Sequence, residues 1–199
     1  MCKCILNILD IKNLLGMRRP IPAYPQDEFV LRASSTPIEI SFFIGNSSVL
    51  TYTSGGTEIT TSYTSGLHET ISIPADPGTD IVFGGNINNV NALGINSGDV
   101  IYISVGRVLQ APVIPVSSLI TMDLRNMYGA MYNAVIEVAN NIRTLYAAAN
   151  TTDHRDICVT YINYSSVTNG GILWIDKTQA YANEVIEVAQ AKGWRVYEL

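Results

Sequence analysis

Four short apolar segments decide the fold that we predict for the C-terminal part of this chain. They are Leu119-Ile-Thr-Met-Asp-Leu124, Ile142-Arg-Thr-Leu-Tyr-Ala147, Ile172-Leu-Trp-Ile-Asp176 and Trp194-Arg-Val-Tyr-Glu198. They start at residues 119, 142, 172 and 194, so the spacings are 23, 30 and 22 residues. A strand this short cannot bury one face alone, whereas parallel strands joined by helical returns stack into a continuous core. The spacing therefore predicts parallel strands separated by helical returns over residues 116–199.

The returns between these strands differ in how strongly they predict helix. The last return begins at Asp176 or Thr178 as helix cap and ends at Gly193, where a left-handed residue is expected. Its apolar residues recur at helical spacing: Ala180, Tyr181, Val185, Ile186, Val188 and Ala189. The segment 153–166 fits a helix capped by Asp153, but its β-branched residues also fit a strand. Because the repeat needs a return there, we predict a helix, and we expect a looser helix over residues 127–140.

Residues 26–115 have a different pattern, with short alternating segments between turn sequences such as Asp76-Pro-Gly78. The expected strands are Ile38–Phe42, Val49–Tyr52, Ile59–Tyr63, Glu69–Ile73, Ile81–Phe83 and Val100–Val105. Strands of this length at nearly regular spacing predict a small antiparallel sandwich or barrel. The part from Ile71 to Val105 fits equally well as the first coils of the C-terminal repeat, and both interpretations stay open.

The first 25 residues predict an anchor followed by a spacer. The segment 1–17 is an apolar run that predicts a helix, and Arg18–Pro25 contains three prolines in six residues, which favours an extended spacer. The helix either packs on its own domain or inserts into a partner subunit. No small-residue cleavage site follows the run, so it is a poor signal peptide. The residues expected to form the assembly anchor are Ile5, Leu6, Leu9, Leu14 and Leu15.

Composition limits the classes of partner. The net charge is −5, and no Lys or Arg occurs between Arg32 and Arg107, so the basic stripe that nucleic-acid binding needs is missing. No stretch of 18 consecutive apolar residues is present, so we expect no membrane span. Charged residues make up only 15% of the chain, and Gly, Asn, Ser, Thr and Tyr supply the polarity instead, as in β-rich extracellular or virion proteins. The cysteines, Cys2, Cys4 and Cys158, lack the spacing of a zinc or redox pair and are expected to be free thiols.

Motifs that would indicate catalysis are missing from the sequence. It contains no nucleophile elbow, dinucleotide fingerprint or phosphate loop. The segment Asp153-His-Arg-Asp156 resembles a metal or acid–base cluster, but acidic residues at the start of a helix explain it more simply. We therefore expect a protein that is not an enzyme and that has no metal and no cofactor.

A surface is the remaining candidate for function. Alternation along the C-terminal strands places Leu173 and Ile175 inside and their neighbours outside. The expected ligand or partner residues are Asp123, Tyr146, Trp174, Asp176 and Tyr197. An exposed tryptophan beside carboxylates suits a sugar ring or a protein loop, and its removal should then leave the melting temperature unchanged. The alternative is that another domain or subunit covers this face.

The C-terminal segments resemble a known family. Residues 119–125, 142–150 and 172–177, with the ending Ala191-Lys-Gly-Trp-Arg-Val-Tyr197, resemble leucine-rich repeat proteins of Bacteroidetes surfaces and of their phages. The region around Gly84-Gly-Asn86 resembles their upstream part, so the resemblance covers about residues 30–199. Together with the patterns described above, we expect an α+β fold with three parts: an N-terminal helix and spacer (1–25), an antiparallel β domain (26–115) and a short leucine-rich-repeat-like α/β solenoid with its cap (116–199).

The resemblance also implies a structural or recognition role with no catalytic residues to transfer. We expect a phage virion component, such as a fibre, decoration or adhesin-like subunit, attached by its N-terminus. The alternative is a bacterial cell-surface adhesin that binds a protein or a glycan. The expected partners are other proteins of a virion or surface assembly, further copies of the chain, and a glycan or host surface.

Overall fold

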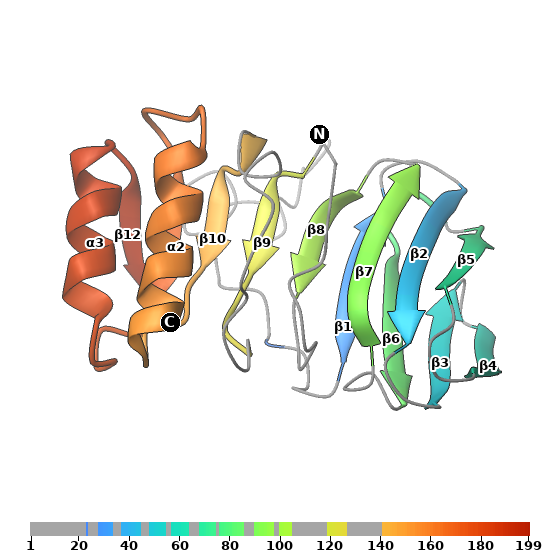
Figure 1. Cartoon of the computed structure of the whole chain (residues 1–199). Helices are drawn as coiled ribbons and strands as arrows, with labels where there is room; N and C mark the ends of the chain where they lie inside the picture. Colours follow the sequence, from blue (N-terminus) through green and yellow to red (C-terminus); the bar gives the residue numbers. More distant parts are fainter. Residues whose placement is uncertain are drawn as a thin grey trace, which may run out of the picture.

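The computed structural model of the 199-residue chain describes residues 23, 28–33, 37–44, 48–54, 57–63, 68–74, 76–85, 90–97, 100–104, 119–126 and 141–199. These residues form twelve strands and two helices (Figure 1). The strands are β1 (Phe29–Ala33), β2 (Ile38–Ile44), β3 (Ser48–Ser54), β4 (Thr57–Tyr63), β5 (His68–Ile73), β6 (Asp80–Gly85), β7 (Val90–Ser97), β8 (Val100–Ser104), β9 (Thr121–Asp123), β10 (Thr144–Tyr146), β11 (Ile172–Ile175) and β12 (Arg195–Glu198). The helices are α2 (Thr152–Tyr164) and α3 (Ala182–Ala191).

Nine of the strands form one mixed sheet that runs the length of the molecule. Its order is β12-β11-β10-β9-β8-β1-β6-β3-β4. Figure 1 shows β12 and α3 at one end and β3 and β4 at the other. The neighbouring strands from β8 to β12 are parallel, whereas those from β8 through β1, β6 and β3 to β4 are antiparallel.

The predicted parallel strands at the C-terminus are confirmed. β9, β10, β11 and β12 each lie inside the segment that predicted them, and they pair in chain order. Their registers align Met122 with Leu145, Leu145 with Leu173, and Leu173 with Val196. Because side chains alternate along a strand, these four residues lie on one face of the sheet.

Helix α2 resolves the ambiguity of residues 153–166 in favour of helix. Its cap is Thr151 rather than Asp153, and the Thr151 side chain accepts a hydrogen bond from the backbone N–H of His154. Thr fits this position because its hydroxyl oxygen satisfies one of the unpaired N–H groups of the first turn. Asp153 lies two residues after the cap, in the first turn, where its negative charge interacts favourably with the positive end of the helix dipole.

Helix α3 ends as expected but begins differently. Its N-terminal flanking residue is Tyr181, which makes no side-chain cap, so the expected caps Asp176 and Thr178 are wrong. At the other end Gly193 has φ +79°, as a left-handed stop requires. The N–H of Gly193 donates to Gln190 O at 2.9 Å, and the N–H of Trp194 donates to Ala189 O at 2.9 Å. This pair of bonds is a Schellman motif, and it turns the chain directly into β12.

The strands predicted for residues 26–115 are also confirmed one by one, as β2, β3, β4, β5, β6 and β8. Strands β1 and β7 were not among them. The turn predicted at Asp76-Pro-Gly78 is present: Gly78 has φ +85°, and its N–H donates to Ala33 O at 2.8 Å. This bond fastens the turn to the end of β1.

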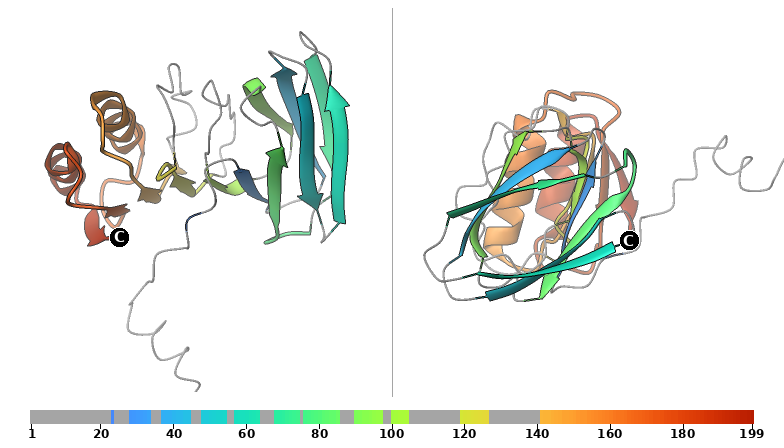
Figure 2. Two further views of the ribbon diagram at one scale, coloured as in Figure 1. Left: turned by 90° about the horizontal axis from the view of Figure 1, so that it is seen from below. Right: turned by 90° about the vertical axis from the view of Figure 1, so that its right-hand side faces the viewer.

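One hydrophobic core serves both parts of the chain. Strands β5, β2 and β7 form a separate three-stranded antiparallel sheet, and Ile40 and Ile73 of that sheet belong to the same buried cluster as Leu145 of β10 and Val185 of α3. The small sheet and the two helices therefore cover the same face of the nine-stranded sheet. In the left view of Figure 2, α2 and α3 lie to one side of the strands.

The expected fold class is wrong. We expected an α+β chain in which an antiparallel β domain precedes a distinct leucine-rich-repeat-like solenoid; instead, the described residues are mostly β, and one mixed sheet includes strands of both parts. The join is β8, which pairs antiparallel with β1 through one edge and parallel with β9 through the other. Alternation within a strand identifies its two faces but not the partners of its two edges, so the pattern could not reveal this continuity.

The predicted N-terminal helix and anchor, residues 1–25, lie outside the described residues except for Ala23, and so does the helix expected over residues 127–140. Of the helices in the described part of the chain, neither is long and apolar enough to cross a membrane.

Candidate functional site

The face of the large sheet opposite the helices carries a row of polar and aromatic side chains. In strand order from β6 to β12 it consists of Asp80, Arg32, Tyr102, Asp123 with the following Arg125, Tyr146, Trp174 and Tyr197. We call this row the ladder. Each of seven neighbouring strands supplies one member, and Arg125 follows β9 directly.

At one end the ladder begins with an ion pair. Arg32 on β1 lies opposite Asp80 on β6, and its Nε and Nη2 atoms donate to the two carboxylate oxygens at 2.6 and 3.0 Å. On its other side Arg32 lies opposite Tyr102, and its guanidinium carbon is 5.0 Å from the centre of the phenol ring. A cation over an aromatic face is attracted by the ring quadrupole, so Arg32 links three strands at once.

The centre of the ladder is the buried carboxylate of Asp123, which is only 2% exposed. The hydroxyl of Tyr102 donates to Oδ2 at 3.1 Å. Arg125 donates from Nε to Oδ1 at 2.9 Å and from Nη2 to Oδ2 at 2.5 Å. The backbone N–H of Arg125 also donates to Oδ1. Burial alone would lower the pKa of Arg125, but the hydrogen bonds and negative charge of Asp123 outweigh it and raise that pKa. The guanidinium of Arg125 is therefore charged, and its hydrogen bonds to Asp123 offset part of the cost of burying that charge.

The remainder of the ladder is aromatic. The guanidinium of Arg125 lies 4.5 Å from the ring centre of Tyr146. Tyr146 stacks on Trp174 with centres 6.1 Å apart and planes 5° apart, and Trp174 stacks on Tyr197 at 4.9 Å and 28°. Tyr146, Ile172 and Trp174 form a small buried cluster of their own, separate from the main core, with Tyr197 packed against it.

The structure brings four of the five predicted surface residues into the ladder: Asp123, Tyr146, Trp174 and Tyr197. Asp176 is elsewhere, in the turn after β11, where its Oδ1 accepts bonds from the N–H and hydroxyl of Thr178 at 2.9 and 2.6 Å. These bonds hold the pKa of Asp176 below its ordinary value. The expected face of Trp174 is correct, but its expected exposure is wrong, since the side chain is only 5% exposed.

Sequence reasoning did not include Arg32, Asp80 and Tyr102 in the site. Arg32 and Asp80 are 48 residues apart in the chain, so no local spacing indicates their contact. A signal was present nonetheless, because Arg32 is the only charged residue in Phe29-Val-Leu-Arg-Ala33, a strand whose other residues are fully buried. An arginine in such a strand requires a charged or aromatic partner.

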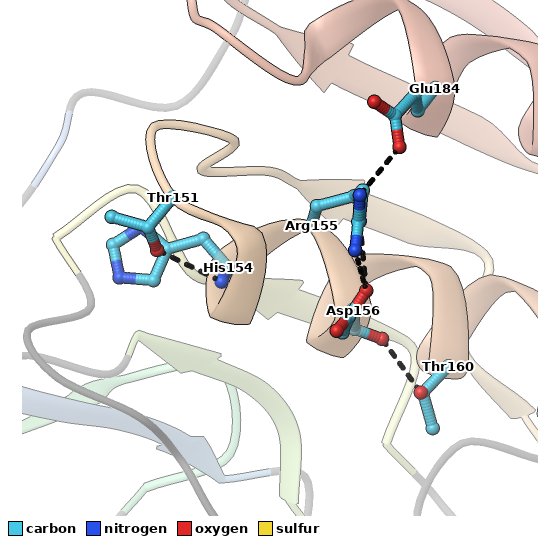
Figure 3. Close-up of polar contacts among 6 residues, drawn as sticks. All are labelled: Thr151, His154, Arg155, Asp156, Thr160 and Glu184. Carbon is cyan, nitrogen blue, oxygen red and sulfur yellow. Dashed lines mark hydrogen bonds and ion pairs between the residues drawn. The ribbon is translucent and has the colours of Figure 1, made fainter.

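The segment Asp153-His-Arg-Asp156 has no part in the ladder and lies at the start of α2 (Figure 3). Arg155 donates to Asp156 and to Glu184 of α3, both at 2.8 Å, and its guanidinium lies 5.3 Å from the ring of Tyr181. The cluster thus joins the two helices. The described residues contain no group of three or more His, Cys, Asp or Glu that would hold a metal ion.

His154 is the one polar group among the described residues whose buried side-chain atom lacks a hydrogen-bond partner: its Nδ1 has none. Figure 3 shows its ring beside Thr151. Desolvation lowers the pKa of His154 below 6.5, and the nearby charge of Asp153 only partly opposes this shift. The imidazole is therefore neutral at neutral pH, which suits packing rather than acid catalysis.

Burial also makes the thiol of Cys158 unreactive. It is fully buried and unpaired, its thiol donates to Ala148 O at 3.3 Å, and desolvation raises its pKa to about 12. A thiol with so little thiolate at neutral pH is a poor nucleophile or metal ligand.

Comparison with known proteins gives no match: no family model matches the chain, and neither a curated protein nor a solved structure matches it. The chemistry of the site therefore has to be inferred from the ladder itself. Its two arginines and two aspartates form two separate ion pairs, Arg32 with Asp80 and Arg125 with Asp123, so the charges within the ladder balance.

Proposed function

We propose that this chain is a non-enzymatic structural and recognition protein that binds a ring-shaped ligand, in the first place a glycan, at the β12 end of the ladder. The observation that carries the proposal is the aromatic stack of Tyr146, Trp174 and Tyr197, which ends on the edge strand of the sheet. Stacked rings on adjacent parallel strands recur at about the strand spacing of 4.8 Å. Among the described residues no strand lies beyond β12, so a sugar or aromatic ring fits the next position of the stack.

The exposure of the side chains along the stack favours Tyr197 as the contact. Tyr146 and Trp174 are 3% and 5% exposed, whereas Tyr197 is half-buried. Arg195 lies two residues before Tyr197, hence on the same face, and is exposed. An aromatic plane beside an exposed guanidinium supplies both stacking area and hydrogen-bond donors for sugar hydroxyls.

We further propose that the protein is a phage virion component, such as a fibre, decoration or adhesin-like subunit, with residues 1–25 as its attachment segment. The sequence resemblance to surface and phage proteins of Bacteroidetes supports this, as does the low charge content of the chain. A bacterial cell-surface adhesin is the alternative, and the ladder would serve either role. Deleting residues 1–25 should abolish incorporation into purified particles and leave the melting temperature within a few degrees, whereas loss of folding in the deleted chain would contradict the attachment role.

The ligand contact is tested with three tyrosine variants on a glycan array and in adsorption to host cells. Tyr197→Ala should weaken binding by about 10- to 100-fold, the usual loss for an aromatic anchor. Tyr197→Phe should retain most of the binding because the ring remains. Tyr164→Ala is the matched control, since Tyr164 is 48% exposed on α2 and lies away from the ladder. Equal binding by Tyr197→Ala and the parent would overturn the ligand site.

A further inference from the structure

Strand β4 forms the other end of the nine-stranded sheet, and its outer edge is unusually suited to pairing. In the described part of the chain it pairs with β3 alone. It has seven residues, and all seven pair with β3 in an unbroken antiparallel register without a bulge. A long, regular edge strand exposes a row of unpaired N–H and C=O groups that accept another strand.

The two ends of the sheet differ in the features that normally prevent such pairing. β12 is four residues long and carries charges at both ends, Arg195 and Glu198, and Glu198 is held 3.4 Å from Lys177. β4, with the sequence Thr-Glu-Ile-Thr-Thr-Ser-Tyr, has no Lys, Arg or Pro and a single charged residue, Glu58. Short length and edge charges are common protections against strand addition, so β12 is protected and β4 is not.

The hairpin geometry identifies which backbone groups face outward. Ser54 pairs with Thr57, so two residues connect β3 and β4. In such a hairpin the closing pair of residues exchanges two hydrogen bonds. Further along the hairpin, hydrogen-bonded and non-hydrogen-bonded residue pairs alternate. Thr57, Ile59 and Thr61 therefore bond to β3, while the N–H and C=O groups of Glu58, Thr60 and Ser62 point away from the sheet.

We propose that β4 pairs antiparallel with β4 of a second copy of this chain, about a twofold axis at Thr60. Thr60 then lies opposite its own copy, and Glu58 lies opposite Ser62 of the partner subunit. The three outward-facing residues of each strand supply six intermolecular hydrogen bonds. The two sheets become one continuous sheet through the dimer, an isologous interface of the kind that closes upon itself.

Charge and apolar exposure both favour a second copy over a different partner. Self-pairing about Thr60 places each Glu58 against a serine, so no like charges meet directly. Ile59 projects toward the core face, yet it is 38% exposed because it lies at the end of the sheet. In the proposed register Ile59 and its copy are diagonal neighbours, about 7–8 Å apart and within reach of each other, so pairing covers exposed apolar surface.

The first test compares Thr60→Pro with Thr60→Val by light scattering and sedimentation over a wide range of concentration. The parent and Thr60→Val should be dimers, while Thr60→Pro should be monomeric because it lacks the central N–H donor. Since that N–H faces outward, proline should leave the melting temperature of the monomer nearly unchanged. A parent that is monomeric at every concentration, or a Thr60→Pro variant as dimeric as the parent, would overturn the proposal.

The second test uses a cross-link that forms only if Thr60 lies close to its own copy. In a hydrogen-bonded antiparallel pair the Cα atoms are about 5.5 Å apart, within the span of a disulfide. Thr60→Cys should therefore form a covalent dimer on oxidation, in a chain whose Cys2 and Cys4 are replaced by serine. Thr152→Cys, at an exposed site on α2, is the control and should remain a monomer on a denaturing gel. Equal cross-linking of the two variants would contradict pairing at Thr60.

Discussion

The indole of Trp194 packs directly on the backbone of Gly171, so closely that a Cβ atom at position 171 would overlap the five-membered ring. The indole Nε1 donates to Val167 O at 2.7 Å, and the side chain is 3% exposed. Trp194 therefore joins the end of α3 to the loop before β11, and it belongs to the same buried cluster as Val185, against which Ile186 also packs.

Replacing Trp194 by alanine should destabilise the protein by about 3–5 kcal/mol, the usual cost of truncating a buried large aromatic side chain. Two losses contribute, the packing on Gly171 and the hydrogen bond to Val167. Chemical denaturation measures the change in the free energy of unfolding. A loss below about 1 kcal/mol, which is typical of ordinary surface substitutions, would show that this packing contributes little.

Gly171→Ala should also destabilise the protein, by about 1–3 kcal/mol, because the added methyl group overpacks the site. Gly171 is not among the glycines with positive φ, so the cost is steric contact rather than backbone strain. The double variant separates the two causes. In the Trp194→Ala background the methyl group meets no indole, and Gly171→Ala should then cost much less than it does alone. Equal cost in both backgrounds would assign the effect to the backbone.

Asp123→Asn should weaken the ladder at its centre. The amide keeps the shape of the carboxylate but removes the charge that balances Arg125, which is itself mostly buried. Breaking a buried pair by removing one partner costs about 3–5 kcal/mol, and the partial exposure of Arg125 places this case at the low end. Arg125→Met in the Asp123→Asn background should recover part of the loss, since no uncompensated charge remains. A double variant no more stable than Asp123→Asn would argue against charge imbalance as the cause.

His154 should make stability depend on pH below neutrality. Its pKa is lowered below 6.5 in the folded chain, so the unfolded chain binds a proton at a higher pH than the folded chain does. The contribution of the neutral His154 side chain to the free energy of unfolding is fully present above pH 6.5. It is lost as the pH falls from there through the pKa of the folded chain. His154→Gln should remove this component, so its melting temperature should fall less than that of the parent between neutral pH and about pH 5. Parallel curves for the two proteins would show that His154 does not contribute.

The sequence predicted local elements better than it predicted their assembly. Every predicted strand and the helix over residues 153–166 are present, because alternation and apolar spacing are local properties. The pairing of β8 with both β1 and β9 was missed, because it depends on strand edges that meet across long separations in the chain. The same limit applies to the ladder. Its aromatic half lies on strands that were expected to be neighbours, whereas the contact of Arg32 with Asp80 follows from a strand order that alternation does not specify.

Trp174→Ala is expected to lower stability, which corrects the prediction made from an exposed side chain. Trp174 is the middle ring of the stack between Tyr146 and Tyr197, and it is 5% exposed. Truncation should cost about 3 kcal/mol, the low end for a buried tryptophan because the surrounding cluster is small. Trp174→Phe should restore most of this loss, since a stacked ring remains between its two neighbours. Tyr164→Ala, at an exposed site, should stay within about 0.5 kcal/mol of the parent. Thermal and urea denaturation of the three variants measure the change in the free energy of unfolding. A Trp174→Ala protein as stable as Tyr164→Ala would show that the aromatic stack does not stabilise the sheet.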